Sequence, residues 1–236
     1  MNRLMVLGLV AIGLLFGAGG MWLAERAAPT AAMDEARVGR IVRDYVLAHP
    51  ELIPEAIEKL QQRESTRAVA SNRSRIEQPY GDAWIGNPNA DVTLVEYYDY
   101  NCGFCRATLP TIEKLVAADK NLRVVFKELP VLADSSRAAA RASLTAAAQG
   151  RFKSFHDALY AAGPVSAATI AQAAKASGVD LTKVPADTEA TLRDNLDIAA
   201  KLGVTGTPAW VVGDQLLSGA LPLDRLQDAI AKARAS

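Results

Sequence analysis

Two cysteines offer the clearest chemistry in this sequence. Cys102 and Cys105 are its only cysteines, and Gly103 and Phe104 separate them. A disulfide that closes so short a loop restricts the unfolded chain only weakly, so a purely stabilising role explains the pair poorly. Two thiols at this spacing can instead form and break a disulfide within one helical turn. The spacing therefore predicts thiol–disulfide exchange.

The elements around the pair support this chemistry. Val92–Tyr98 is rich in β-branched and aromatic residues and predicts a buried strand, and Cys102–Ala118 predicts a helix. A helix N-terminus offers unpaired N–H groups and a partial positive charge, and both stabilise a thiolate. We expect Cys102 to be the exposed nucleophile and Cys105, one turn further, to be the buried resolving thiol.

Metal binding and haem attachment fit the pair less well. A zinc site needs further ligands, but no other cysteine exists, and His49 and His156 lie far apart in the sequence. We expect His156 on the surface of a helix. A haem attachment motif needs a histidine after the second cysteine, where Arg106 stands. We therefore expect neither a metal nor an organic cofactor.

The remaining segments predict an α/β domain. Leu122–Leu129 indicates a second strand, so that strand, helix and strand form a βαβ unit. An alanine-rich helical insertion covers about 134–202. Ala209–Val212 and Gln215–Ser218 indicate two further strands, joined by a two-residue hairpin turn. Pro222–Ala233 indicates a closing helix.

The N-terminus predicts export. Residues 1–26 hold an uncharged stretch, Leu4–Ala24, that is long enough to cross a bilayer as one helix. It is either a membrane anchor or a cleaved signal peptide, because Ala18-Gly19-Gly20 supplies a small-residue cleavage site. Both interpretations place the rest of the chain on the extracytoplasmic side, where disulfide chemistry is sustained.

Residues 27–78 predict a linker and a helical extension, and residues 79–236 the main domain. Val38, Ile41, Val42, Tyr45 and Val46 recur at helical spacing. The break at His49-Pro50 divides the extension into two helices. Such helices either pack on their own domain or join copies into a homo-oligomer, and the sequence holds no sustained heptads to decide.

Bulk charge gives no sign of a nucleic-acid partner. The chain carries 26 basic and 26 acidic residues, and its formal net charge is zero. A protein that binds a polyanion over a broad surface usually carries a basic excess. We therefore expect no nucleic-acid binding.

The pattern as a whole resembles a known family. The strand–CGFC–helix unit, Pro110 after the second cysteine, the Thr207-Pro208 dipeptide and the long helical insertion resemble the thioredoxin fold of the DsbA-like type. The resemblance covers roughly Val92–Ala233. The helical extension resembles proteins of the copper-sensitivity (ScsC) or Com1-like kind. The resemblance implies a thioredoxin-like α/β fold with a helical insertion.

The resemblance also implies roles for residues near the pair. Pro208 matches the cis-proline loop that faces the cysteines, and Thr207 matches the residue that presents its backbone to an extended client peptide. Gly103 and Phe104 are expected to border the client. Strongly oxidising members carry Pro-His between the cysteines, so Phe104 leaves the potential anywhere between about −270 and −120 mV.

Two charged residues on the strands complete the predicted site. The resemblance implies that Glu96 is a buried acid that relays the proton of Cys105. It also implies that Lys127, on the neighbouring strand, is the partner of Glu96. As an alternative, Glu96 faces water on an edge strand, and Lys127 and Glu128 mark the solvated end of theirs.

These expectations describe an exported protein that exchanges disulfides with client proteins and needs a redox partner protein for turnover. The direction, oxidase, isomerase or reductase, is left open. An alternative from another class is a client-binding chaperone or a Cu(I)-binding module, since Cu(I) favours thiolates. We expect a periplasmic location, secreted or tied to the inner membrane by the N-terminus.

Overall fold

The computed structural model describes residues 35–235, and the chain divides into two compact units, residues 1–57 and 58–236. The apolar segment that predicts a signal peptide or anchor lies outside the described residues. Within residues 35–235, no helix is both long and apolar enough to span a membrane.

Two helices form the extension. α2 covers Glu35–Ala48 and α3 covers Leu52–Glu77, with the predicted break at His49-Pro50 between them. No residue of α2 is buried within the chain. α3 buries Val69 and Ile76 in its C-terminal half, against one face of the sheet. The two parts of the extension therefore differ, since α3 contributes to the core of the second unit.

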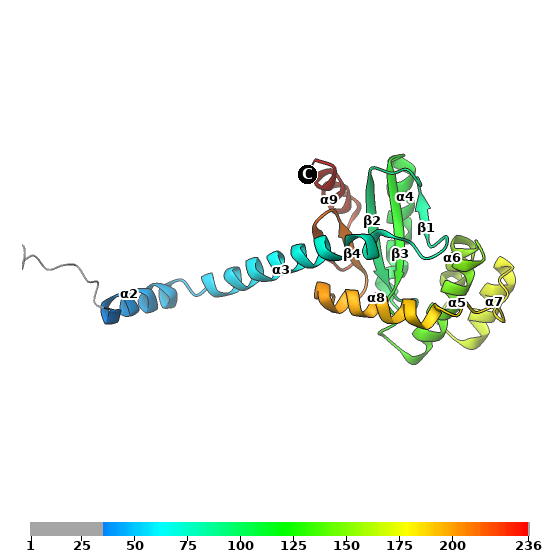
Figure 1. Cartoon of the computed structure of the whole chain (residues 1–236), viewed down its shortest axis with the longest axis horizontal. Coiled ribbons are helices and arrows are strands. Elements are labelled where there is room, and N and C mark those ends of the chain that lie inside the picture. The colour runs from blue at the N-terminus through cyan, green and yellow to red at the C-terminus, as the bar shows by residue number, and fades with distance from the viewer. Residues whose placement is uncertain (1–34, 236) are drawn as a thin grey trace, which may run out of the picture. The chain divides into compact units, whose positions relative to one another are not determined.

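A five-stranded mixed sheet lies at the centre of the second unit (Figure 1), in the order β1-β3-β2-β4-β5. The strands are β1 (Trp84–Gly86), β2 (Val92–Tyr98), β3 (Leu122–Glu128), β4 (Ala209–Val212) and β5 (Gln215–Ser218). β2 and β3 are parallel, and the other pairs are antiparallel. The sequence predicts all but β1, which is three residues long and lies among turn-forming residues.

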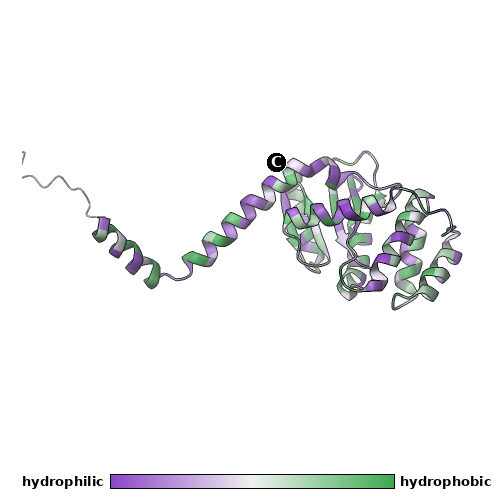
Figure 2. Ribbon diagram, turned by 60° about the horizontal axis from the view of Figure 1, so that its bottom comes forward, coloured by the Kyte–Doolittle hydropathy of each residue, from purple (hydrophilic) through white to green (hydrophobic). Residues whose placement is uncertain are grey.

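Helices cover both faces of the sheet. They are α4 (Gly103–Ala118), α5 (Asp134–Ala148), α6 (Phe152–Ala161), α7 (Ala167–Ser177), α8 (Thr188–Leu202) and α9 (Leu223–Ala235). α4, α9 and the α5–α7 group share one core cluster with the sheet, and α3 and α8 share the other. In Figure 2 the strands are mainly green, while the covering helices mix green and purple segments. The predicted α/β fold with a helical insertion is confirmed.

β2 is buried on both faces because it lies third of five strands and helices pack on each side. Its side chains alternate, so Leu94, Glu96 and Tyr98 face α4, and Val95 and Tyr97 face α3 and α8. All seven of its residues are buried. Glu96 therefore does not face water, and the edge-strand alternative for this residue is wrong.

The β4–β5 hairpin confirms the predicted two-residue turn. Gly213 has a φ of 54°, which an L side chain rarely adopts. A Cβ at this position would also lie 2.9 Å from the Cβ of Ala233 in α9. The turn therefore requires glycine for its backbone conformation and for the close approach of the last helix.

A buried polar network joins the sheet to the insertion. The Tyr98 hydroxyl donates to the Glu128 carboxylate and lies 3.2 Å from the Ser143 hydroxyl of α5. The Tyr100 hydroxyl donates to Ser143 Oγ at 3.0 Å and lies 3.0 Å from Nδ1 of His156 in α6. The network ties the ends of β2 and β3 to α5 and α6.

Two expectations fail in this network. His156 is 1% exposed and packs among Tyr98, Phe126 and Phe152, so its predicted surface position is wrong. The hydroxyl of a neighbouring tyrosine satisfies one ring nitrogen, which makes a neutral buried histidine tolerable. Glu128 is also buried rather than solvated. A helical insertion covers the end of its strand, which strand patterns alone do not reveal.

Glu128 makes stability depend on pH. Burial raises the pKa of Glu128 to about 8, so the folded state keeps its proton while the unfolded chain ionises near its ordinary value. The stabilisation of the folded state that depends on the protonated Glu128 carboxyl group is complete at low pH, and it is lost as pH rises through about 8. Glu128→Gln mimics the protonated acid. We therefore expect its free energy of unfolding, relative to that of wild type, to rise by a few kcal/mol between pH 4.5 and 8.

Urea denaturation at pH 5 and pH 8 checks this expectation. The comparison uses the difference between variant and wild type, so that groups such as His156, which titrate in both proteins, cancel. Parallel stability profiles for the two proteins would show that Glu128 is ionised alike in the folded and unfolded states.

Candidate active site at the Cys102–Cys105 pair

The pair lies where the sheet meets α4. Cys102 is the N-cap residue of this helix, with an extended backbone, and Sγ accepts a hydrogen bond from the Cys105 amide at 3.2 Å. This thiol therefore occupies the place of an N-capping side chain, at the positive end of the helix dipole. A thiolate there receives a backbone N–H bond and a favourable field, and both favour the nucleophilic form.

Cys102 is less accessible than the sequence predicts. Its exposed fraction is 5%, against 1% for Cys105, so the expectation of an exposed nucleophile is wrong. The loop before β4 covers the thiol, and Cys102 Sγ donates to the Thr207 carbonyl at 3.3 Å. Phe104, in contrast, is 68% exposed beside the pair. This loop therefore limits access to Cys102 Sγ, and Phe104 is the exposed side chain beside the pair.

The covering loop contains a cis peptide bond between Thr207 and Pro208, the conformation expected for this position. The backbone amides of Thr205, Gly206 and Thr207 have no hydrogen-bond partner among the described residues. Backbone groups without internal partners can pair with an extended peptide. This loop therefore combines a carbonyl that contacts the nucleophile with free main-chain donors.

Cys105 differs from Cys102 in its surroundings. It lies one turn inside α4 and is almost completely buried. Burial, followed by the nearby Glu96 carboxylate, raises the pKa of the Cys105 thiol. The thiol is therefore protonated at neutral pH, and its attack on another sulfur requires a base.

Glu96 is the acid beneath the pair. It is 1% exposed, and burial raises its pKa well above the ordinary range. The Thr108 hydroxyl donates to Glu96 Oε1 at 3.3 Å and to the Cys105 carbonyl at 2.8 Å. Oε2 is buried and has no partner among the described residues. A buried carboxyl group with one free oxygen and a raised pKa can exchange a proton with the Cys105 thiol beside it.

Lys127 is not the partner of Glu96, and this expectation is wrong. In the parallel β2–β3 register, Glu96 pairs with Phe126 and Tyr97 pairs with Lys127. Lys127 therefore projects from the opposite face of the sheet. Its Nζ donates to the carbonyls of Arg75 at 2.8 Å and Gln78 at 2.7 Å, where α3 ends. Burial lowers the pKa of Lys127 to about 8, and the ammonium caps a helix C-terminus.

Asp99 organises the loop that leads to the pair. Its Oδ1 accepts the amide of Asn101, and its Oδ2 accepts the amides of Val131 and Leu132 after β3. Its backbone carbonyl accepts the Cys102 amide at 2.9 Å. Asp99 therefore fixes the active-site loop, while Cys102 itself caps the helix.

Sequence reasoning missed Thr108. Its position, three residues after Cys105, puts it on the same face of α4, and this spacing is the signal that could have identified it. Among residues 35–235, no three His, Cys, Asp or Glu side chains are grouped to hold a metal ion. The two thiols are therefore the reactive groups that this arrangement brings together, with Glu96 as the neighbouring proton acceptor.

Comparison with known proteins agrees with the fold and the cysteine site described above. The family model of the DSBA-like thioredoxin domain matches residues 93–231. The chain belongs to this family. A second model, described as the copper resistance protein ScsC N-terminal domain, matches residues 34–66, the helical extension. The fold is therefore that of the DsbA-like thiol–disulfide oxidoreductases, preceded by an ScsC-like segment.

Solved structures support the assignment. A linker-deletion mutant of Proteus mirabilis ScsC is 31% identical, with a TM-score of 0.75, over 89% of this chain and 99% of that one. A periplasmic thioredoxin-like protein from Salmonella enterica serovar Typhimurium is 32% identical, with a TM-score of 0.64, over 70% of this chain and 96% of that one.

A curated relative is much longer. The Na(+)/H(+) antiporter NhaA 1 of Salinispora arenicola is 27% identical over an alignment 243 positions long, which covers 95% of this chain and 37% of the antiporter. The chain thus spans just over a third of the length of this curated relative.

Thr108→Val should slow the reaction that depends on Cys105. The variant removes the hydroxyl that stabilises the Glu96 carboxylate, so less of the base form is present at neutral pH. We expect about tenfold slower release of a peptide held on Cys102, with the pH–rate profile moved to higher pH. Stopped-flow resolution of a preformed mixed disulfide measures both, and Thr108→Ser is the matched control.

An unchanged pH–rate profile in Thr108→Val, with Thr108→Ser equally slow, would contradict this role for the hydroxyl. Loss of packing alone slows Thr108→Ser, which lacks the methyl group, more than Thr108→Val, which keeps the side chain's shape, and it does not move the profile.

Lys127→Met should affect stability and not exchange. The variant leaves the carbonyls at the end of α3 without their donor, which costs about 1 to 3 kcal/mol. We expect the disulfide-exchange rate to stay within about twofold of wild type. Urea denaturation and exchange with a model disulfide peptide test the two expectations, and a large loss of rate at unchanged stability would restore Lys127 to the active site.

Proposed function

We propose that this chain is an extracytoplasmic protein thiol–disulfide oxidoreductase that works through Cys102 and Cys105. The observation that carries the proposal is the position of Cys102 at the N-cap of α4, where its sulfur accepts the Cys105 amide. This geometry favours the thiolate of Cys102 as the attacking and leaving sulfur. The reactive disulfide is part of the chain, and the proposal includes no separate cofactor.

In the oxidising direction, a client thiolate attacks Sγ of Cys102 in the Cys102–Cys105 disulfide. The disulfide breaks, Cys105 leaves and takes up a proton with Glu96 as the donor, and a mixed disulfide joins the client to Cys102. A second client thiolate then attacks the client sulfur and releases the Cys102 thiolate. The client gains a disulfide, and the chain is left with two reduced cysteines.

In the reducing or isomerising direction, the Cys102 thiolate attacks a client disulfide and one client thiolate leaves. Glu96 accepts the proton of the Cys105 thiol, which then attacks Cys102 and frees the client. The chain ends as the disulfide and the client as two thiols. Turnover in either direction needs a redox partner protein that restores the starting state.

The proposed client site is the loop around Pro208. The free amides of Thr205–Thr207 are available to an extended client strand, and the Thr207 carbonyl lies against the nucleophile. Gly103 and the exposed Phe104 follow Cys102 at the start of α4, and the proposal places them beside the client. Main-chain pairing of this kind accepts many client sequences, which suits a protein that acts on diverse partners.

The export signal and the relatives support an extracytoplasmic location. The uncharged N-terminal stretch predicts export, and the Salmonella protein with this fold is described as periplasmic. Disulfide chemistry is sustained in that compartment. The membrane is a partner of this chain if the N-terminal segment is retained.

The reduction potential of the pair decides the direction. Equilibration of a fragment starting near Ala27 in glutathione buffers should give one two-electron transition, read by thiol alkylation. A potential near −120 mV makes the protein a dithiol oxidase, and one near −200 mV or below makes it an isomerase or reductase. Absence of an intramolecular disulfide at every ratio of reduced to oxidised glutathione would overturn the proposal.

Self-association through the extension is a further part of the proposal. Apolar side chains in α2 and early α3 are each at least half exposed: Ile41, Val42, Tyr45, Leu47, Ile53 and Ile57. An apolar helix face without a partner is typical of a surface that binds another chain. Analytical ultracentrifugation should show an oligomer for the fragment from Ala27 and a monomer after deletion of residues 35–57. Equal masses for the two proteins would show that residues 35–57 do not mediate self-association.

The same apolar surface favours a second candidate function, a client-holding chaperone in which redox turnover is secondary. Cys102→Ser separates the two, because protection of an unfolding client should persist without the thiol only if the surface holds the client. A Cu(I)-binding role of the thiol pair belongs to this candidate, and it predicts a thiolate–copper absorption band that Cys102→Ser removes.

A further inference from the structure

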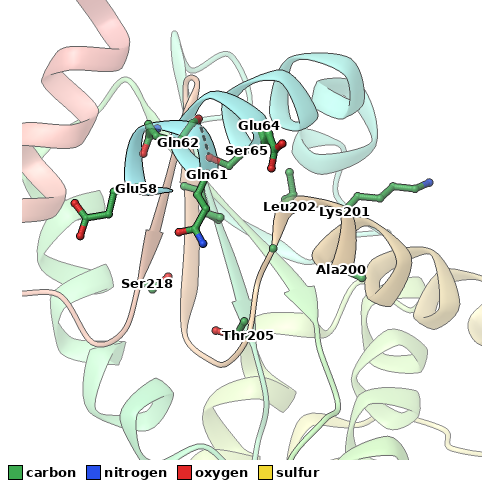
Figure 3. Close-up of a pocket in the computed structure, with 12 residues that line it drawn as sticks. Glu58, Gln61, Gln62, Glu64, Ser65, Ala200, Lys201, Leu202, Thr205 and Ser218 are labelled. Atoms are coloured by element: carbon green, nitrogen blue, oxygen red, sulfur yellow. Dashed lines mark hydrogen bonds between the residues drawn. The ribbon is translucent and has the colours of Figure 1, made fainter. Parts of the chain in front are cut away.

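A groove next to the proposed client loop has no role in the exchange chemistry. It has a volume of about 840 Å³ and lies entirely within the second unit. Polar residues of α3 form one wall: Glu58, Gln61, Gln62, Glu64 and Ser65. The opposite wall comes from the end of α8, the loop that follows it, and β5. Figure 3 shows Gln61 reaching from α3 toward Thr205 and Ser218.

The groove continues the surface around the nucleophile. Thr205 lines it, and Thr205 is two residues before Thr207, whose carbonyl contacts Cys102 Sγ. Two residues span at most about 7 Å of extended chain. A client bound at Cys102 and running along this loop therefore reaches the groove within a few residues of its own cysteine.

A sheet edge also borders the groove. β5 is the last strand of the sheet, so one of its edges is free of strand partners among the described residues. Leu216 and Ser218 of this strand line the groove, and Leu202 and Gly203 continue the wall toward the client loop. An edge strand offers main-chain donors and acceptors to an extended peptide rather than to a compact ligand.

The charge of the groove is negative. Glu58 and Glu64 form no ion pair or hydrogen bond with their side chains among residues 35–235. Lys201 lines the same groove, but its ammonium is bonded to Asp197 at 2.7 Å, and Figure 3 shows the side chain extending away from the cavity. Two unpaired carboxylates beside a free strand edge complement a cationic side chain on an extended chain.

We propose that this groove binds an extended segment of the client polypeptide and selects clients with a lysine or arginine close to the reacting cysteine. The inference rests on the proposed function, because the client's cysteine must engage Cys102 for the segment to reach the groove. Glu58 and Glu64 contact the cationic side chain, and the edge of β5 holds the main chain. Neither glutamate takes part in the exchange of sulfur bonds.

Synthetic peptides with one cysteine in a mixed disulfide with glutathione test the proposal. One set carries a single lysine two to five residues before or after the cysteine, and a second set carries glutamate in the same places. We expect reduced wild-type protein to favour at least one lysine peptide over its glutamate counterpart by about tenfold in the second-order rate constant of a single turnover, in which the Cys102 thiolate attacks the peptide sulfur and glutathione leaves. In Glu58→Gln/Glu64→Gln the preference should fall to twofold or less, with the lysine peptide affected most.

The matched control is Glu113→Gln/Asp224→Asn, which removes the same charge from two exposed residues of the second unit that do not line the groove. It should retain the lysine preference, because a contact and not the net charge sets it. The preference of wild type should also weaken as salt rises from 50 to 500 mM, since screening acts on exposed ion pairs.

The results separate two kinds of failure. Equal rates for lysine and glutamate peptides, or a preference that survives in Glu58→Gln/Glu64→Gln, would overturn the groove assignment and leave the oxidoreductase intact. No exchange with any peptide would overturn both. A change of oligomer mass in Glu58→Gln/Glu64→Gln would show that the groove joins copies of this chain, which also contradicts client binding.

Discussion

The hydrogen bond from the Cys105 amide to the Cys102 sulfur is the interaction on which the rest of the site depends. It exists because α4 begins one residue after Cys102, so that the thiol replaces an ordinary capping side chain. The Cys102 amide is in turn held by the Asp99 carbonyl, while the Asp99 carboxylate accepts amides from its own loop and from the loop after β3. Disturbing this loop would move the nucleophile away from the helix end.

Burial of β2 separates the chemistry of the two thiols. Helices on both faces bury Glu96, and the same packing buries Cys105, so burial raises the pKa of both groups. Cys102 lies at the border of this core, under a loop that can pair with a client. One thiol is thus placed for attack and the other for resolution, although their positions in the sequence differ by a single helical turn.

Local patterns predicted the strands β2 to β5, the helix after the cysteines and the break before Pro50, because each has a clear periodicity or turn signal. The errors concern tertiary packing. The family resemblance implies that Lys127 is the partner of Glu96, but the strand register places Lys127 on the other face of the sheet. The burial of His156 and of Cys102 depends on which helix or loop covers each residue, and local patterns do not reveal this. The short strand β1 forms through its pairing with β3.

The most direct test of the account is to trap the client on one sulfur. The account predicts that Cys105→Ser, mixed with a disulfide-bonded client peptide, accumulates a mixed disulfide at Cys102 that mass spectrometry detects. Cys102→Ser should accumulate none, because the buried Cys105 thiol stays protonated and out of reach. A mixed disulfide on Cys105 in Cys102→Ser at a comparable rate would contradict the assignment of Cys102 as the nucleophile.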